Sequence, residues 1–517
     1  MTTVPTAAGD LVLRDLLGPA LARHAGRPAL VAHGRTWTYA ELDRAARSLA
    51  ARLQAEGVGP GSAVALVLPN GAEYVIADLA IALLGAAKVP LNLMLSDDEQ
   101  AYMLTDSRAV VCVVTHDRLA SVELARERGA DPRAIVVGGP DDGWAPALAG
   151  PPLAELPAVP PDARALIMYT GGTTGLPKGV VHQQRGLAMN LVSHLVEMEL
   201  TAEDVLLLTS PLPHSAGFLL QAALAKGART LVEERFDAEQ VVDRIEHDDV
   251  SYLFLVPTMI YRLLDAVAAR GSLDASSLRT ILYGAAPITP DRLEQGLALL
   301  GPVFVQLYAQ SEAPNFLTRL RRDDHRAGPT GAARLTSCGQ SVLMAEVRVV
   351  REDGTRCDPG EVGEVTARSP YTMQGYLDRP VETAEALRDG WLHTGDLGFL
   401  TADGYLHLVD RKKDMIITGG LNVYSSEVEQ VLARLDEVES VAVAGVPHPD
   451  WGEAVVAFVV PAGPGVTPEA ILAAARDELT TYKRPKDVVL VDTLPTTAVG
   501  KVDKKALRAR MRNGDAT

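Results

Sequence analysis

The stretch Tyr169–Gly179, YTGGTTGLPKG, lies between two short apolar runs, ALIMY and VVH. Glycines let the backbone turn tightly and bring its amides to an anion, threonines add hydroxyl donors, and lysine adds positive charge. The G-K-[ST] step of a Walker loop is missing, because Pro177 precedes Lys178 and Gly179 follows it. The stretch therefore predicts a phosphate-binding loop of another kind. Its expected phosphate contacts are Thr170, Gly171, Gly172, Thr173, Thr174, Gly175 and Lys178.

Strand patterns alternate with helix patterns on both sides of this loop. Short aliphatic runs recur between amphipathic segments, among them AVALVL from Ala63, AVVCVV from Ala109, AIVVGG from Ala134 and SYLFLV from Ser251. This alternation is typical of parallel sheets covered by helices. We therefore predict an α/β fold.

Two changes in composition divide the chain. Residues 138–162 are rich in proline and glycine, which predicts an exposed connector between two subdomains. After Asp410 the charged run DRKKD leads into a segment with its own α+β pattern. We therefore predict an N-terminal domain over residues 1–410 and a small, mobile C-terminal domain over residues 411–517.

Composition narrows the class of protein. The 517 residues are 47% hydrophobic and carry a net charge of -17, which argues against nucleic acid or an anionic membrane as the main partner. Three cysteines without a CxxC or Cys/His pattern argue against a disulfide framework or a zinc site. The apolar stretch from Val75 to Leu95 contains Asp78 and Lys88, so it predicts a buried helix and no membrane insertion. We expect a cytoplasmic protein without a signal peptide.

Further segments follow the glycine-rich loop in a fixed order. They are PLPHSAG from Pro211, GAAP from Gly284, YAQSE from Tyr308, HTGDLG from His393, DRKKDMIITGGLNVYSSEVE from Asp410 and TTAVGKVDK from Thr496. Together with the loop they resemble the motifs of the adenylate-forming superfamily, which contains acyl- and aryl-CoA ligases, nonribosomal peptide adenylation domains and beetle luciferases. The resemblance spans nearly the whole chain. It implies an N-terminal domain of helix-covered parallel sheets with a small barrel-like subdomain, and a rotating C-terminal lid.

The resemblance also implies roles for single residues in activating a carboxylic acid with ATP. Tyr308 would stack on adenine, Ser311 would donate to the α-phosphate, and Glu312 would hold Mg²⁺, a hard cation that needs oxygen ligands. Asp396 and Arg411 would bind the ribose. The remaining nucleotide contacts would be Gly284, Ala285, Ala286, Pro287 and Ala309.

Residues near the C-terminus would alternate between two reactions. Lys501 would be the cation of the first step, in which the acyl-adenylate forms, although a solvated lysine in a basic tail is the alternative. Lys413 would be the pivot of the lid. Gly419 and Gly420 would line the channel for the thiol of coenzyme A, with an ordinary turn as the alternative.

The residues expected at the acyl group are mainly apolar. They are Met189, Asn190, His214, Phe218, Tyr283 and Pro314, with Gly284 and Ala309 beside the carboxylate. For His214 a packed loop position is the alternative. The set lacks a buried acid that could pair with the ammonium of an amino acid, so we expect a hydrophobic fatty, aryl or polycyclic acid.

Several positions depart from the pattern of the superfamily. Gly171 stands where serine is usual, Ala309 where glycine is usual and Ser311 where threonine is usual. None removes a charge on which the chemistry depends. We predict an acid:thiol ligase that uses ATP, Mg²⁺ and coenzyme A. The alternatives are an enzyme that loads a carrier protein or a partner, and a non-catalytic nucleotide-binding relative; a homodimer is compatible with each.

Overall fold

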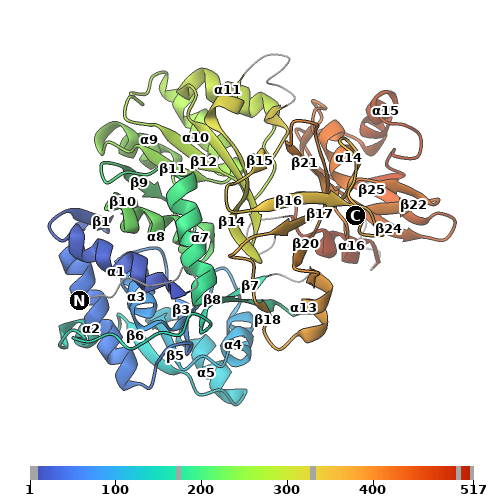
Figure 1. Ribbon diagram of the computed structural model, residues 1–517. Helices are drawn as coiled ribbons and strands as arrows, with labels where there is room; N and C mark the ends of the chain where they lie inside the picture. The colour runs from blue at the N-terminus through green and yellow to red at the C-terminus, as the bar shows by residue number, and fades with distance from the viewer. Residues whose placement is uncertain (1–9, 171–175, 327–333, 497–501, 513–517) are drawn as a thin grey trace. The chain divides into compact units, whose positions relative to one another are not determined.

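The computed structural model describes residues 10–170, 176–326, 334–496 and 502–512 (Figure 1). The chain forms two compact units, the first from Met1–Val347 with Ala367–Leu392 and the second from Arg348–Thr366 with His393–Thr517. The division passes through the strands β16 (Glu346–Val350), β17 (Gly363–Arg368) and β20 (Trp391–Leu400). The mobility of a C-terminal domain that begins at residue 411 is a separate matter, and it stays a prediction.

A nine-stranded sheet, here called sheet A, lies in the first unit in the order β15-β14-β13-β12-β11-β9-β10-β1-β2. Its run from β13 to β1 is parallel, whereas β2, β14 and β15 are antiparallel to their neighbours. The bounds are β1 Pro28–Ala32, β2 Arg35–Thr38, β9 Val205–Leu208, β10 Arg229–Val232, β11 Tyr252–Leu255, β12 Thr280–Tyr283, β13 Phe304–Gln310, β14 Ala313–Leu320 and β15 Gln340–Ser341.

A seven-stranded sheet, here called sheet B, has the order β18-β8-β7-β4-β3-β5-β6. Its strands from β7 to β6 are parallel, and β8 and β18 are antiparallel additions. The bounds are β3 Ala63–Val67, β4 Ala87–Pro90, β5 Val111–Thr115, β6 Arg133–Val137, β7 Arg164–Thr170, β8 Lys178–Gln183 and β18 Gly375–Tyr376. The two sheets confirm the predicted α/β class, and the aliphatic runs quoted above form β3, β5, β6 and β11.

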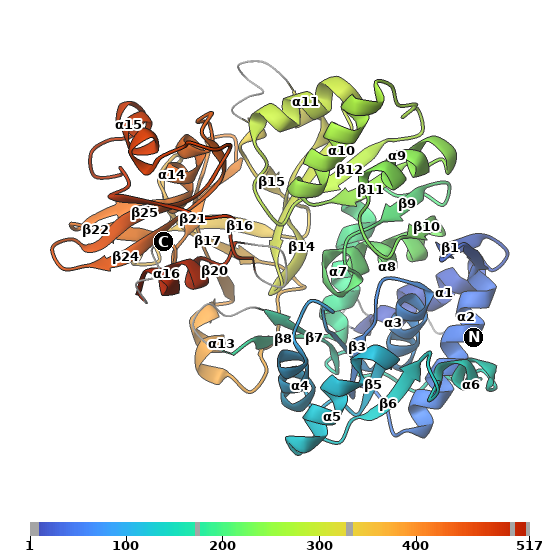
Figure 2. The same ribbon diagram turned by 180° about the vertical axis from the view of Figure 1, so that it is seen from behind.

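Helices fill the space between the sheets and cover their outer faces (Figures 1 and 2). The helices of the first unit are α1 Leu13–Arg23, α2 Tyr39–Ala55, α3 Ala72–Leu84, α4 Asp97–Asp106, η2 His116–Arg118, α5 Leu119–Glu127, α6 Trp144–Ala149, α7 Gln184–Glu197, η3 Leu212–Ala216, α8 Gly217–Lys226, α9 Ala238–His247, α10 Pro257–Arg270, α11 Pro290–Leu300, η4 Arg322–Asp324 and α13 Pro380–Ala386.

The main apolar core joins the two sheets. It includes Leu208 and Leu307 from sheet A, Leu66 and Leu166 from sheet B, and most of α3. Every residue of α3 except Glu73 is buried, as expected for a helix that is hydrophobic all round and lies inside a protein. The prediction of a buried helix in the stretch from Val75 to Leu95 is confirmed up to Leu84, whereas the rest of the stretch forms β4 and the turn after it. Within the described residues, no helix has the length and apolar character needed to cross a membrane.

The proline-rich segment 138–162 differs from its prediction. It connects β6 to β7, which are strands of the same sheet, and not two subdomains. Because β6 lies at the edge of sheet B and β7 lies between β4 and β8, the chain must return across the sheet. On the way it forms α6, whose Trp144 and Ala147 pack into the main core.

The second unit contains the predicted α+β segment. Its five-stranded sheet has the order β23-β22-β25-β24, with β26 parallel to β25. A further sheet, through which the division between the units passes, has the order β16-β17-β20-β19 and pairs β20 with β21. The remaining bounds are β19 Leu387–Arg388, β21 Leu406–Arg411, β22 Ile416–Thr418, β23 Leu421–Val423, α14 Ser425–Leu432, β24 Val438–His448, β25 Gly452–Pro461, α15 Pro468–Glu478, β26 Asp487–Leu490 and α16 Lys504–Arg512.

Candidate active site

Two of the predicted nucleotide motifs lie side by side at one edge of sheet A. Strands β12 and β13 are parallel neighbours with Tyr283 opposite Gln306, so the GAAP segment follows β12 at the end of the sheet near which Tyr308 lies within β13. Ligands of open α/β sheets bind at this edge. A Cβ at Gly284 would lie 2.6 Å from the carbonyl oxygen of Leu307, so no side chain fits there. Ala285 has a φ of 68°, a left-handed conformation that alanine rarely adopts.

The predicted metal ligand and the lysine of the phosphate loop contact the same phenol. Glu312 lies in the short connection between β13 and β14, and its Oε1 accepts a hydrogen bond of 2.7 Å from the hydroxyl of Tyr376. Lys178 Nζ lies 4.8 Å from the centre of the Tyr376 ring. Burial and the negative charge of Glu312 raise the pKa of Tyr376, so its hydroxyl stays a donor. Sequence reasoning missed Tyr376, since nothing in its local pattern marks it.

A buried histidine fastens the phosphate loop's second strand to the same connection. His182, on β8, donates from Nε2 to the carbonyl oxygen of Ser311 at 2.8 Å. Burial lowers the pKa of His182 to about 4, so the ring is neutral. Its Nδ1 has no hydrogen-bond partner in the described part of the chain. The histidine was visible in the VVH run, but its role depends on a contact between distant segments.

Gly171, Gly172, Thr173, Thr174, Gly175 and Lys501 lie outside the described residues. Thr170 ends β7 and pairs with Lys178 at the start of β8, so the two ends of the glycine-rich segment are neighbours. The two strands predicted on either side of the loop are thus present as β7 and β8.

The two predicted ribose residues are paired within the second unit. Asp396 on β20 and Arg411 on β21 are opposite one another, and Arg411 Nε lies 3.1 Å from Asp396 Oδ1. The carboxylate is buried, whereas the arginine is exposed. A cavity of about 320 Å³ adjoins them. Its lining residues are Thr394, Gly395, Arg411, Lys412 and Lys413.

The glycine pair assigned to the thiol channel forms the tip of a hairpin. Gly419 and Gly420 connect β22 to β23, with Thr418 opposite Leu421. Both have positive φ values, 57° and 80°, which a two-residue hairpin turn requires and glycine adopts without strain. The turn alone accounts for both glycines, and their contact with a thiol remains a prediction.

The candidate acyl residues are only partly brought together. Asn190 on α7 donates to the carbonyl oxygen of Pro314 at 2.8 Å, and Phe218 on α8 stacks on His194 with 6.1 Å between ring centres. His214 contacts the side-chain amide of Asn92 at 3.0 Å. Met189, beside Asn190, is half-buried.

Tyr283 does not join this group. Its ring is fully buried in the separate core cluster that covers the other face of sheet A. Its hydroxyl lies 3.0 Å from His325 Nε2. The strand alternation of β12 turns Tyr283 away from the cluster that contains Phe218. Tyr283 is therefore a core residue in this structure, unlike its predicted place in the acyl pocket.

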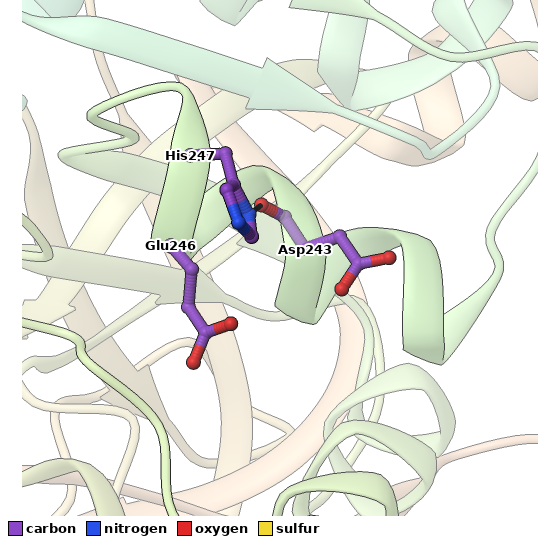
Figure 3. Close-up of side chains that lie close together, drawn as sticks. All are labelled: Asp243, Glu246 and His247. Atoms are coloured by element: carbon purple, nitrogen blue, oxygen red, sulfur yellow. Dashed lines mark hydrogen bonds between the residues drawn. The ribbon is translucent and has the colours of Figure 1, made fainter.

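Figure 3 shows Asp243, Glu246 and His247 on α9, whose ligand atoms lie within 4.8 Å of one another. Both carboxylates are already paired with Arg270, at 2.8 Å from Asp243 and 2.7 Å from Glu246. This group is therefore explained as a surface ion-pair network. It does not replace Glu312 as the predicted magnesium ligand.

Comparison with known proteins agrees with these motifs. The family described as AMP-binding enzyme matches residues 19–377, and the AMP-binding enzyme C-terminal domain matches residues 427–501. The chain is 37% identical to the medium/long-chain fatty acid–CoA ligase FadD8 of Mycobacterium tuberculosis over 521 residues, covering 96% of this chain and 90% of that protein. It is 40% identical to a feruloyl-CoA synthase of an Amycolatopsis species over 498 residues, covering 95% of this chain and 97% of that protein.

A solved structure extends the match to three dimensions. The crystal structure of ATP-bound MatB from Rhodopseudomonas palustris superimposes with a TM-score of 0.87 at 29% identity, covering 97% of this chain and 99% of that chain. Both parts of the chain thus have counterparts in one family. The chain belongs to the AMP-binding, adenylate-forming enzyme family.

Proposed function

We propose that this protein is an AMP-forming acid:CoA ligase for a hydrophobic carboxylic acid. The observation that carries the proposal is the meeting of Glu312 and Lys178 around Tyr376, beside the carboxyl ends of β12 and β13. A carboxylate and an ammonium group held close together suit the two needs of a bound triphosphate, which are a metal ligand and a counter-charge.

The residues present fit a magnesium ion. Glu312 offers a carboxylate, the kind of oxygen ligand that Mg²⁺ prefers, and the hydrogen bond from Tyr376 to Oε1 leaves its second oxygen available. Magnesium usually takes one or two carboxylates together with substrate phosphates. When bound, it would neutralise phosphate charge. Tyr376 then orients the Glu312 side chain, and Lys178 supplies a further positive charge to the phosphate loop.

The reaction has two balanced steps. An oxygen of the substrate carboxylate bonds to the α-phosphorus of ATP while the bond to pyrophosphate breaks. The sulfur of coenzyme A, after loss of its proton, then bonds to the acyl carbon while AMP leaves. Negative charge grows on phosphate oxygens in the first step, so alignment and fixed positive charge supply most of the catalysis. We assign the ribose contacts to Asp396 and Arg411, and the two-step alternation to Lys501 and Lys413.

Coenzyme A is the acceptor that the relatives support, because the names of both relatives given above, a fatty acid–CoA ligase and a feruloyl-CoA synthase, contain it. A carrier protein as acceptor and a homodimer remain hypotheses, as does a cytoplasmic location. The acyl residues support an apolar acid. Phe218 and Pro314 are apolar, and the side-chain amide of Asn190 already donates to the carbonyl oxygen of Pro314.

The deciding experiment offers fatty, aryl and polycyclic acids to the purified protein with ATP and Mg²⁺. We expect at least one apolar acid to support exchange between ATP and pyrophosphate, and coenzyme A to convert that acid to its thioester with release of AMP. A holo carrier protein is the competing acceptor. Exchange without any thioester of coenzyme A would favour the carrier protein, and absence of exchange with every acid would refute the ligase.

Tyr376→Phe tests the link between Glu312 and Lys178. The substitution removes the hydroxyl that donates to Glu312 but keeps the ring beneath Lys178. A hydrogen bond to a charged group contributes about 1.5–3 kcal/mol, so we expect kcat/KM for ATP to fall roughly tenfold or more. Steady-state kinetics at saturating acid measures it.

Tyr39→Phe is the matched control for this substitution. It removes another buried hydroxyl, which donates at 2.7 Å to the carbonyl oxygen of Ala228, the residue before β10. We expect an unchanged KM for ATP in the control. Equal effects of the two substitutions on ATP kinetics would show that the Tyr376 hydroxyl acts only through stability.

A further inference from the structure

A buried ion pair lies in the main core between α3 and sheet B. Lys88 Nζ on β4 is 2.7 Å from Asp78 Oδ1 on α3, with 10% and 4% of the two side chains exposed. Gln221 Nε2 on α8 donates to the other oxygen of Asp78 at 2.9 Å. The neighbours of these three residues are mainly aliphatic. The consecutive elements α3 and β4 and the distant helix α8 therefore converge on a polar cluster inside an apolar layer.

The cluster adjoins the segment that carries two of the candidate acyl residues. A Cβ at Gly217 would lie 3.9 Å from Lys88 Nζ, and Gly217 directly precedes Phe218. Gln221 is one helical turn further along the same helix. Val89 and Leu91 pack into the core on the opposite face of sheet B. Alternation along the strand thus directs Lys88 towards the start of α8.

Asn92 extends this face towards the reacting end of the candidate pocket. It follows β4, and its amide lies 3.0 Å from His214 Nε2 in η3. The segment that follows β4 therefore contacts the His214 turn, and the strand itself places Lys88 beside Gly217 on the next turn. The polar cluster is at one end of the segment that runs from His214 to Gln221.

The ion pair is incompletely satisfied. An ammonium group has three N–H donors, and within the described residues Asp78 is the acceptor found for Lys88. Replacing a buried ion pair by apolar side chains is often neutral or stabilising, so packing alone gives no reason for a lysine here. Unused N–H donors at a buried position are costly unless another group accepts them.

We propose, on the basis of the ligase function above, that Lys88, Asp78 and Gln221 form the polar end of the acyl pocket and select acids with a neutral oxygen remote from the carboxyl group. A hydroxyl or carbonyl oxygen accepts from Lys88, and a hydroxyl can also donate to Asp78. Because Lys88 and Asp78 cancel in charge, a second carboxylate would leave a net negative charge buried, which is unfavourable.

The test compares acids that differ in one oxygen. The pairs are para-hydroxyphenylpropanoate with phenylpropanoate, and an ω-hydroxy fatty acid with the unsubstituted acid of equal length. A site that hydrogen-bonds a substrate hydroxyl strongly rejects an analogue without that hydroxyl. We therefore expect kcat/KM for AMP formation to be higher for each hydroxy acid by roughly tenfold or more. Para-carboxyphenylpropanoate should have a lower kcat/KM than both para-hydroxyphenylpropanoate and phenylpropanoate.

The double substitution Lys88→Met with Asp78→Leu removes both charges together and avoids an unpaired buried ion. We expect the preference for the hydroxy acid to fall to within about twofold, since its hydrogen-bonding partners are gone. Tyr39→Phe is the matched control. The Tyr39 hydroxyl is also buried in the main core, but it donates to the carbonyl oxygen of Ala228 at 2.7 Å and to no member of the polar cluster, so its removal should leave the preference unchanged.

The outcomes separate this inference from the ligase function. Equal use of the paired acids by the unaltered protein, or a preference that survives the double substitution, would overturn the role of Lys88 while the ligase stands. Equal loss of activity towards both acids in the double variant, with the preference kept, would mean that the pair is structural. If no acid of the panel supports AMP formation, the ligase function and this inference both fail. The ranking in the unaltered protein decides the matter even where the variant does not fold.

Discussion

Glu312→Gln should reduce acid-dependent exchange between ATP and pyrophosphate by roughly a hundredfold or more, because it removes the charge of the carboxylate that we assign to magnesium. Glutamine has the same shape and can still accept the hydrogen bond that Tyr376 donates at 2.7 Å. The fold should therefore be kept, with an unchanged melting temperature. Exchange measured over a range of Mg²⁺ concentrations should show that much more metal is needed in the variant.

Glu382→Gln is the control that tests charge without a ligand role. Glu382 lies on α13 and raises the pKa of Tyr376 through its negative charge, as Glu312 does more strongly. Its removal changes the local field but no predicted ligand. We expect exchange within about twofold of the unaltered protein, as for surface substitutions away from special features. A loss as large as that of Glu312→Gln would mean that general electrostatics, and not metal binding, explains the effect.

The sequence predicted the fold from local patterns. Aliphatic runs such as AVALVL form buried parallel strands, because both faces of these sheets are covered and alternation with polar residues is not needed. The same reasoning identified α3 despite Asp78, whose charge is balanced by Lys88. It failed for residues 138–162, because proline and glycine mark an irregular segment but do not say which strands that segment joins.

The site was predictable where its residues are neighbours in the sequence. Gly284 could be assigned a close-approach position, and Leu307 now supplies the physical reason. Tyr376 and His182 could not be assigned, because each acts through one contact with residues 311–312, more than sixty positions away in sequence. Contacts of that kind depend on tertiary pairing, such as that of β18 with β8, which no local pattern encodes.

Lys501→Ala should abolish most of the first step and spare the second. An ammonium group at the attacking carboxylate stabilises charge that develops as the adenylate forms, and removal of one such donor typically costs 10²–10³-fold in rate, on the order of 3–4 kcal/mol. Lys501 lies outside the described residues, between Thr496 and Val502, whose backbones form an isolated antiparallel bridge. Exchange between ATP and pyrophosphate measures the first step, and thioester formation from a preformed acyl-adenylate with coenzyme A measures the second.

Lys505→Ala provides the comparison, because Lys505 is an exposed lysine at the start of α16 only a few positions beyond Lys501. It removes the same charge from the same basic segment, so a general attraction for ATP would be lost equally in both variants. Lys504 is unsuitable, since its ammonium lies 2.7 Å from Glu429 and 2.6 Å from Ser425 Oγ and fastens α16 to α14. Undiminished exchange in Lys501→Ala would remove this lysine from adenylation. Equal losses in both half-reactions would contradict a cycle in which the lid withdraws Lys501 before the thiol attacks.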